Sequence, residues 1–151
     1  MIVDHIGISC ADLEASKRFY DTVLATLGHR RVLDVGVAVG YGSDSPDFWI
    51  AQPEVETDNR ESHLAFTASG VEAVHAFHAA ATGLGAETLH EPRLWPEYHP
   101  GYYAVFVRDP DGNNVEAVFH GAAGEAYATG EASASGAMGT SGDPGEAREE
   151  A

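Results

Sequence analysis

The sequence predicts an α+β fold built from two tandem modules, each running as one strand, one helix and three further strands. The first observation is an internal repeat, in which His5-Ile-Gly-Ile-Ser9 is echoed 58 positions later by His63-Leu-Ala-Phe-Thr67. The second is that the helical segment after each of these strands ends at a matched glycine, Gly28 or Gly85. Self-similarity at a fixed spacing indicates a duplicated structural unit. We therefore expect two copies of one βαβββ module.

Helix signals follow the opening strand of each copy. In the first copy Asp12 is suited to the N-cap, because its side chain can accept a hydrogen bond from the first helical turn. In the second copy Ser69 and Glu72 have the spacing of a capping box. An apolar stripe predicts the buried face of the first helix, made by Leu13, Tyr20, Val23, Leu24 and Leu27.

Three strand-like runs follow each helix. They cover residues 31–35, 37–41 and 47–51 in the first copy and residues 86–89, 102–108 and 113–119 in the second. The last two runs are joined through Asp109-Pro-Asp-Gly112, where Asp-Gly is a strong signal for a tight turn. The stretch from His90 to Gly101 holds three prolines and several aromatic residues. We expect it to be a long irregular loop that borders a site.

Composition predicts one globular domain followed by a tail. A chain of 151 residues, 44% of them hydrophobic, can bury one sizeable core. We expect this domain to span residues 1–120, as modules 1–58 and 59–120. From Gly121 onward the chain is rich in Gly, Ala, Ser, Thr and Glu and has few large apolar side chains. Residues 121–151 are therefore expected to form a disordered acidic tail.

The charge of the chain excludes several classes of partner. The formal net charge is -16, and outside residues 121–151 there are still 18 acidic residues against 7 basic ones, a net charge of -11. Such a surface repels nucleic acids and anionic membranes. No apolar run approaches the roughly 18 residues of a membrane span, and the N-terminus lacks a signal pattern, so we expect a cytoplasmic protein. The lone Cys10 is expected to be a small buried residue without chemistry.

One constellation of residues suggests metal chemistry. Alternation along the last strand puts Glu116 amid apolar residues, where a carboxylate needs a partner because desolvating it unpaired is costly. His5 and His63 occupy equivalent positions in the two copies of the repeat and could supply two nitrogen ligands to the same ion. Taken singly, each histidine could be an ordinary core or edge residue, and Glu116 could form a salt bridge. Their coincidence favours a metal site made by two histidines and one carboxylate.

Several motifs resemble one known superfamily over residues 1–120. The most specific is the turn and strand from Val107 to Glu116, Val-Arg-Asp-Pro-Asp-Gly-Asn-Asn-Val-Glu. Weaker ones are the opening Asp4-His-Ile-Gly, the Phe19-Tyr20 pair and His63-Leu-Ala-Phe. With the tandem βαβββ layout, they make the chain similar to the glyoxalase, bleomycin-resistance and extradiol-dioxygenase proteins, the vicinal oxygen chelate superfamily.

The resemblance implies a half-barrel of two modules around a cleft for metal and ligand. It also implies one divalent ion, such as Zn, Fe(II), Ni, Mn or Co, bound by His5, His63 and Glu116. Glyoxalase-like members use a fourth ligand, often Glu, on the last strand of the first module. Here Trp49 stands at that place, which argues against isomerase chemistry that needs a second carboxylate.

The leading functional hypothesis is a metalloenzyme of lyase, isomerase or dioxygenase type. It would act on a small molecule with two neighbouring oxygens, which the metal chelates as a Lewis acid. Tyr103 and the loop residue His99 are candidates for proton transfer, and Trp49 for a pocket wall that binds substrate. The sequence leaves open which of Tyr102 and Tyr103 shares the face of Glu116. A homodimer is possible.

Two alternatives stay open. The chain could be a metal-free protein that sequesters a drug or metabolite, as bleomycin-resistance relatives do, and its acidic surface would favour cationic ligands. It could instead be a structural partner with a vestigial metal site. Metal content separates the first hypothesis from both alternatives.

Overall fold

The two copies of the repeat fold into two four-stranded sheets that share one topology. The computed structural model describes residues 3–55 and 58–129. The first module comprises β1 (Ile6–Ser9), α1 (Leu13–Ala25), β2 (Arg30–Asp34), β3 (Ala38–Gly42) and β4 (Pro46–Ala51). The second comprises β5 (His63–Thr67), α2 (Val71–Gly83), β6 (Thr88–Leu94), β7 (Tyr102–Arg108) and β8 (Asn114–His120), and α3 (Ala122–Thr129) follows.

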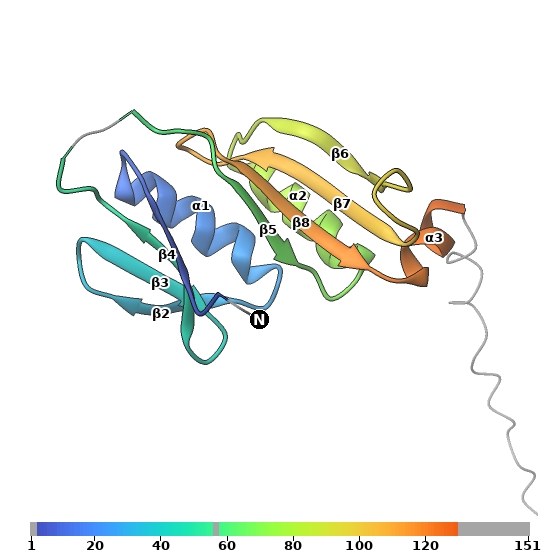
Figure 1. The fold of residues 1–151 in the computed structure, drawn as a ribbon, viewed down its shortest axis with the longest axis horizontal. Coiled ribbons are helices and arrows are strands. Elements are labelled where there is room, and N and C mark those ends of the chain that lie inside the picture. Colours follow the sequence, from blue (N-terminus) through green and yellow to red (C-terminus); the bar gives the residue numbers. More distant parts are fainter. Residues whose placement is uncertain (1–2, 56–57, 130–151) are drawn as a thin grey trace, which may run out of the picture.

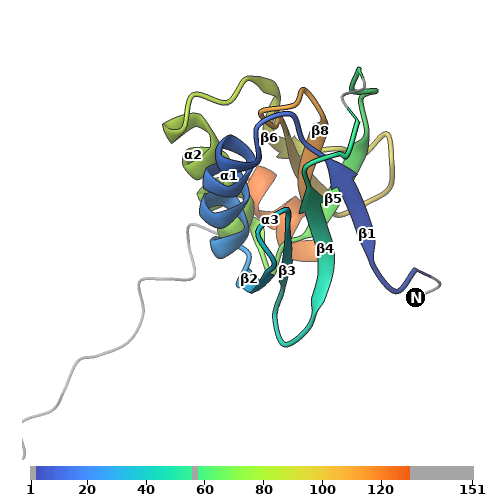
Figure 2. The same ribbon diagram turned by 90° about the vertical axis from the view of Figure 1, so that its left-hand side faces the viewer.

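The sheets have the strand orders β1-β4-β3-β2 and β5-β8-β7-β6. In each sheet the opening strand pairs in parallel with the last strand of its module, and the other neighbours are antiparallel. The sheets lie side by side, with α1 and α2 covering the same face and contacting each other (Figures 1 and 2). The predicted α+β fold of two tandem modules is confirmed. Within the part of the chain described, no helix is long and apolar enough to span a membrane.

The first helix forms as its sequence predicts. Asp12 caps it by accepting a hydrogen bond from the Ala15 amide at 3.0 Å, and Gly28 adopts a φ of 83° just beyond its end. Residues without a Cβ adopt this left-handed conformation at little cost. The helix buries Leu13, Ser16, Phe19, Tyr20, Val23 and Leu24 against the sheets. The stripe predicted from the sequence therefore faces the core.

The second helix begins differently from the prediction. Its N-cap is Gly70, and no side chain caps the first turn, so the expected capping box of Ser69 and Glu72 is wrong. The far end agrees with the sequence, because Gly85 has a φ of 82°. Helix α2 thus depends on packing of its apolar face, which buries Val71, Val74, Phe77 and Ala81.

The predicted loop from His90 to Gly101 is shorter than expected. Strand β6 continues to Leu94, which pairs with Tyr103 of β7. The register of this pair shifts between His90 and Arg93, at the position of Pro92. A proline cannot donate to the ladder, and strands accommodate it at such irregular positions. The loop is thus confined to the stretch between Leu94 and Tyr102, after an irregular strand β6.

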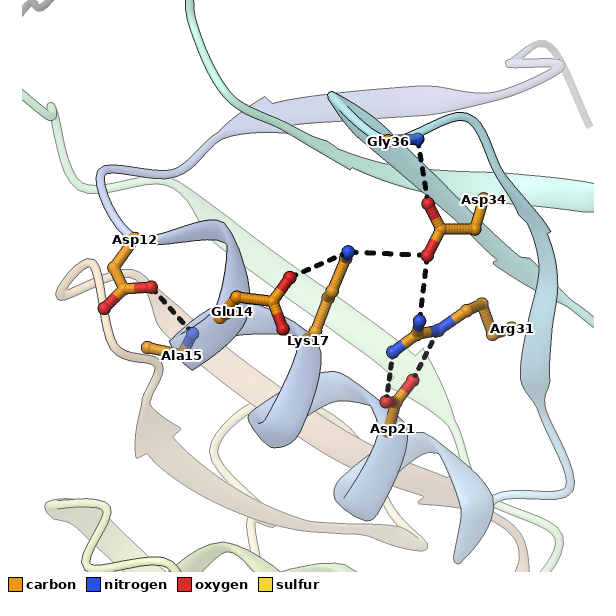
Figure 3. Close-up of polar contacts among 8 residues, drawn as sticks. All are labelled: Asp12, Glu14, Ala15, Lys17, Asp21, Arg31, Asp34 and Gly36. Atoms are coloured by element: carbon orange, nitrogen blue, oxygen red, sulfur yellow. Dashed lines mark hydrogen bonds and ion pairs between the residues drawn. The ribbon is translucent and has the colours of Figure 1, made fainter.

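A set of ion pairs fastens β2 to α1 (Figure 3). Arg31 of β2 donates to both carboxylate oxygens of Asp21 on α1 and to Asp34 at 2.9 Å. Lys17 of α1 bridges Glu14 at 2.9 Å and Asp34 at 3.4 Å. Exposed pairs of this kind contribute little each, but a connected set with a bidentate arginine fixes geometry. The network orients the β2–β3 hairpin on the helix.

The first part of the expected tail forms a helix. Residues Ala122–Thr129 form α3, so the prediction of disorder is wrong for them, while residues 130–151 lie outside the described part. Tyr127 packs its ring 5.7 Å from that of Tyr103 and 5.3 Å from His75. A Cβ on Gly124 would lie only 3.1 Å from the Tyr103 Cβ, so the small residues of this segment allow a close approach. The segment packs on the domain mainly through Gly124 and Tyr127, and most of its other described residues are exposed.

The Asp-Pro-Asp-Gly-Asn turn between β7 and β8 joins the two modules. Asp109 is 5% exposed and accepts a 2.7 Å hydrogen bond from the hydroxyl of Tyr20, which lies on α1 of the other module. Its carboxylate also accepts from the Asn113 side chain at 2.8 Å and from the backbone amides of Asp111 and Asn113 at 2.9 and 2.8 Å. Burial, and then the nearby Asp109 charge, raises the pKa of Tyr20 far above its usual value. The tyrosine therefore stays a donor.

The other side chains of the turn extend this junction. Asp111 accepts from the Ala11 amide at 2.7 Å and from the Ser16 hydroxyl at 3.0 Å, both in the first module. The side-chain oxygen of Asn113 accepts from the Ser62 amide at 3.0 Å, next to the start of β5. The turn of residues 109–113 is thus hydrogen-bonded to α1 and to the residue just before β5, and it leads directly into β8.

We expect Leu24→Ala to lower the free energy of unfolding by about 2 to 5 kcal/mol, because it removes a large side chain from the core. Leu24 is 1% exposed, whereas Leu33 is 47% exposed and serves as a matched control. Urea denaturation of both variants measures the difference. Equal stabilities would show that this helix face is not buried.

We expect Tyr20→Phe to cost about 1 to 3 kcal/mol, since a buried carboxylate loses a charged hydrogen bond while the ring packing is kept. Tyr127→Phe, at a tyrosine that is 39% exposed, is the control and should be nearly neutral. Thermal unfolding reports both. A neutral Tyr20→Phe would contradict the bridging role of Asp109.

A chain cut after His120 should melt several degrees lower than the full chain, because Tyr103 and His75 lose the cover of α3. Each kcal/mol lost shifts the melting temperature of a domain of this size by about 2 to 8 °C. A chain cut after Thr129 retains the helix and should melt like the full chain. If both truncated chains melt alike, α3 contributes nothing to stability.

Candidate functional site

The second sheet has one face against the helices and one open face. Tyr103, Val105, Val107, Val115 and Ala117 belong to the main core with residues of α2. A separate apolar cluster of Trp95, Ala104, Phe106 and Val118 lies on the opposite face. Cross-strand pairing of Phe106 with Glu116 and of Tyr102 with His120 puts these four side chains on the open face too. The open face therefore carries both aromatic and ionisable groups.

Glu116 and His63 meet on this face. The Nε2 atom of His63 lies 3.1 Å from the Oε2 atom of Glu116. The Glu116 side chain is 1% exposed, whereas the His63 side chain is 52% exposed. The His63 ring is nearly parallel to that of Phe106, with the ring centroids 6.0 Å apart. The pair thus joins a buried carboxylate to a histidine that is open to incoming molecules.

The second oxygen of Glu116 is held by Tyr102, whose hydroxyl donates to Oε1 at 2.5 Å. Burial, and then the hydrogen bond to this carboxylate, raises the pKa of Tyr102, so the phenol stays protonated and keeps donating. Both oxygens of Glu116 therefore have a partner, which a desolvated carboxylate requires. Tyr102 is the neighbour of Tyr103 whose strand parity the sequence left open.

Tyr103, the tyrosine proposed for proton transfer, lies on the face of the sheet opposite to Glu116. Its side chain is 4% exposed on the helix-covered face, and its hydroxyl lies 2.9 Å from Nε2 of His75 on α2. The signal that separates the two tyrosines is strand parity. Counting back from Glu116 across the tight turn pairs it with Phe106, and even-numbered residues of β7 share that face.

His99 lies at the rim of the open face, next to Tyr102. Their ring centroids are 5.2 Å apart, and His99 Nε2 is 3.1 Å from Nδ1 of His120 at the end of β8. His99 is not hydrogen-bonded to Glu116; its Nδ1 is 2.7 Å from the Pro100 carbonyl oxygen. The structure therefore places His99 beside the site and keeps it exposed.

His5 lies apart from His63 and Glu116. Its Nδ1 is 2.7 Å from Asp4, and its side chain is 61% exposed. It lines a cavity of about 320 Å³ whose walls include Tyr41 and Phe66. Among the residues described, no three His, Cys, Asp or Glu side chains converge on a point that could hold a metal. A single chain thus brings together two of the three predicted ligands and leaves out His5.

Trp49 stands where the repeat would place a second Glu116. In the first module Trp49 pairs with Gly7, and in the second Glu116 pairs with Ala65. Gly7 and Ala65 each lie two residues after the histidine of their copy. The indole lies over Gly40 of β3, where an added Cβ would be 2.9 Å from its Cζ2 atom. The open face of the first module therefore presents an aromatic surface in place of a carboxylate.

The observed donors fit part of a metal site. Two ligand atoms bound to one ion at about 2.0 to 2.2 Å lie roughly 3 Å apart when they are neighbours in the coordination sphere. The 3.1 Å between His63 and Glu116 meets this condition, and one nitrogen with one oxygen suits a divalent ion such as zinc or iron(II). If both residues bound one ion, a complete site would need a third group.

Comparisons with known proteins agree with this architecture. YqjT of Bacillus subtilis (strain 168) is 32% identical over 127 residues, which cover 76% of this chain and 95% of that protein. A solved glyoxalase/bleomycin resistance protein from Albidiferax ferrireducens T118 is 32% identical, with a TM-score of 0.72 over 79% of this chain and 99% of its own. The lactoylglutathione lyase of Agrobacterium tumefaciens, 24% identical, has the same fold, with a TM-score of 0.59 over 79% of this chain and 92% of its own.

The family match covers most of the chain and both modules. Residues 2–117 match the Glyoxalase/Bleomycin resistance protein/Dioxygenase superfamily, so the matched region begins before β1 and ends within β8, one residue after Glu116. The solved relative at 32% identity is covered almost from end to end. The chain therefore belongs to this superfamily, as the turn motif and the duplicated module suggest.

Proposed function

We propose that the protein is a metal-dependent enzyme whose site is completed by two copies of the chain. His63 and Glu116 of one copy would share a divalent ion with His5 of a second copy. The observation that carries this proposal is the contact of His63 with a buried Glu116 at the centre of an open sheet face. A homodimer with twofold symmetry would form two identical sites, because each copy presents the same surfaces to the other.

When bound, a divalent ion supplies Lewis acidity to two neighbouring oxygens of a substrate, such as those of a hydroxycarbonyl, a diketone or a catechol. The chain's own groups set the conditions for this chemistry. Tyr102 holds one oxygen of Glu116 and leaves Oε2 directed at His63. Phe106, beside His63, excludes water from one side of the pair.

The remaining groups bear on proton transfer and substrate choice. His99, exposed beside Tyr102, can exchange a proton with solvent at the rim of the site. Trp49 supplies a flat apolar wall on the first module, and its indole cannot act as a base near neutral pH. A reaction that shuttles a proton between two carboxylates is therefore disfavoured. A lyase or dioxygenase type of reaction, which needs fewer protein bases, fits this residue set better.

A metal-free binding protein is the second candidate. It is favoured by the incomplete ligand set of a single chain and by the aromatic surface of Trp49. The net charge of -11 outside residues 121–151 would attract a cationic ligand by long-range forces. Such a protein would sequester a planar drug or metabolite without changing it.

Metal titration by calorimetry tests the proposal. We expect His63→Ala, Glu116→Gln and His5→Ala each to weaken Zn²⁺ binding by about 100-fold or more, since each removes one of three protein ligands. Tyr102→Phe should weaken it by about 10-fold, the scale of a group that orients a ligand. His78→Gln on α2 is the matched control. Unchanged affinity in His63→Ala and Glu116→Gln would exclude this metal site, and a lack of Zn²⁺ binding by the unaltered chain would favour the metal-free binder.

Mixing two inactive variants tests where His5 comes from. If the ligands belong to two copies, a mixed dimer of His5→Ala and His63→Ala chains contains one intact site, and part of the metal binding returns. If all three ligands come from one chain, mixing restores nothing.

A further inference from the structure

A pair of histidines, neither of them among the metal ligands proposed above, lies at the end of the open face. His99 belongs to the loop between β6 and β7, and His120 is the last residue of β8. Both segments lie at the same end of the second module (Figure 1), because Tyr102 pairs with His120. His99 Nε2 and His120 Nδ1 are 3.1 Å apart, and both side chains are exposed.

The hydrogen bonds of His99 fix which of its nitrogens is free. Its Nδ1 lies 2.7 Å from the carbonyl oxygen of Pro100, and a carbonyl oxygen can only accept. Nδ1 therefore carries the proton, and in the neutral ring Nε2 has a lone pair directed at His120. Histidines that bind metals commonly have this arrangement, with one ring nitrogen donating to a backbone carbonyl and the other on the metal.

We propose that His99 and His120 together bind a divalent transition-metal cation such as Cu²⁺ or Ni²⁺. Two metal–nitrogen bonds of about 2.1 Å, meeting at an angle between square and tetrahedral, separate their nitrogens by roughly 3.0 to 3.4 Å. The observed 3.1 Å lies within this interval. The two exposed rings are 20° from parallel with their centroids 5.1 Å apart, and rotation of the rings would bring both lone pairs to one point beside the line that joins the nitrogens.

Binding requires no net loss of a proton from the pair. In the metal-free form the His120 Nδ1–H donates to Nε2 of His99, since the latter carries the lone pair. When the metal takes both lone pairs, the proton of His120 resides on its Nε2 instead, and both rings stay neutral. The described residues hold no group of three His, Cys, Asp or Glu side chains suited to a metal, so water completes the coordination of this two-histidine site.

Two further features favour a cation here. The chain carries a net charge of -16, which raises the concentration of divalent cations near its surface. Imidazole ligands bind Cu²⁺ most tightly among the common divalent ions, followed by Ni²⁺ and Zn²⁺. A bound ion would also fasten the β6–β7 loop, next to Tyr102, to the end of β8.

Copper binding to the full chain tests the proposal, in a His63→Ala and Glu116→Gln background that removes the ligands considered above. Cu²⁺ is added alone, and electron paramagnetic resonance detects coupling to two imidazole nitrogens. Calorimetry with Ni²⁺ gives the affinity. We expect His99→Gln and His120→Gln each to lower Ni²⁺ affinity at least 10-fold and to abolish the two-nitrogen copper signal. His78→Gln is the control and should preserve both.

Two outcomes would overturn the proposal that His99 and His120 bind a metal. If His99→Gln lowers the melting temperature but leaves Ni²⁺ affinity and the copper signal unchanged, the two rings share a hydrogen bond only and the proposal is overturned. A variant that fails to fold is replaced by nuclear magnetic resonance of the double-variant background. Substoichiometric Cu²⁺ should then broaden the ring signals of His99 and His120 first, and uniform broadening of all exposed histidines would also overturn the proposal.

Discussion

The hydrogen bond between Tyr20 and the buried Asp109 carboxylate is the constraint on which the rest of the structure depends. It connects a helix of the first module to the turn that leads into the last strand of the second. Removing either partner would leave a polar group desolvated in the interior, which is costly. Asp111 and Asn113 extend the junction to the first module and to the entry of β5. The carboxylates of this motif are therefore structural, and they set the position from which Glu116 enters the sheet.

The duplicated frame carries different chemistry in its two halves. Equivalent strand positions hold Trp49 in the first module and Glu116 in the second, beside equivalent histidines. Only the second half adds a tyrosine, Tyr102, that orients its carboxylate. The first module thus presents an apolar ring at this position, and the second presents a carboxylate. A chemical function that draws on both requires them to face each other, and in a symmetrical assembly two copies can achieve this.

Local sequence signals predicted most of the fold, because they report local physics. The Asp12 cap, the two left-handed glycines and the hairpin turn depend on a few neighbouring residues, and each appears in the structure. Local signals did not predict the elements whose structure depends on contacts with residues distant in the sequence. Pro92 lies inside β6, where the pairing with β7 is irregular. Helix α3 forms although its own apolar content is low, because Tyr127 packs against Tyr103 and His75. The placement of His63 with Glu116 followed from strand parity and the repeat. The position of His5 did not, because it depends on how the two sheets sit beside each other.

The close approach of Trp49 to Gly40 has an evolutionary consequence. A side chain at position 40 would meet the indole at 2.9 Å and Pro46 at 2.6 Å, so the bare backbone of β3 is the floor on which the ring lies. Replacing Trp49 with a short carboxylate would expose the backbone at Gly40 and leave a groove that no protein side chain fills. Converting this half of the molecule into a copy of the other is therefore expected to involve a larger residue at position 40 as well as a carboxylate at position 49. Positions 40 and 49 are therefore expected to vary together among relatives, with a glycine at 40 wherever 49 is a tryptophan.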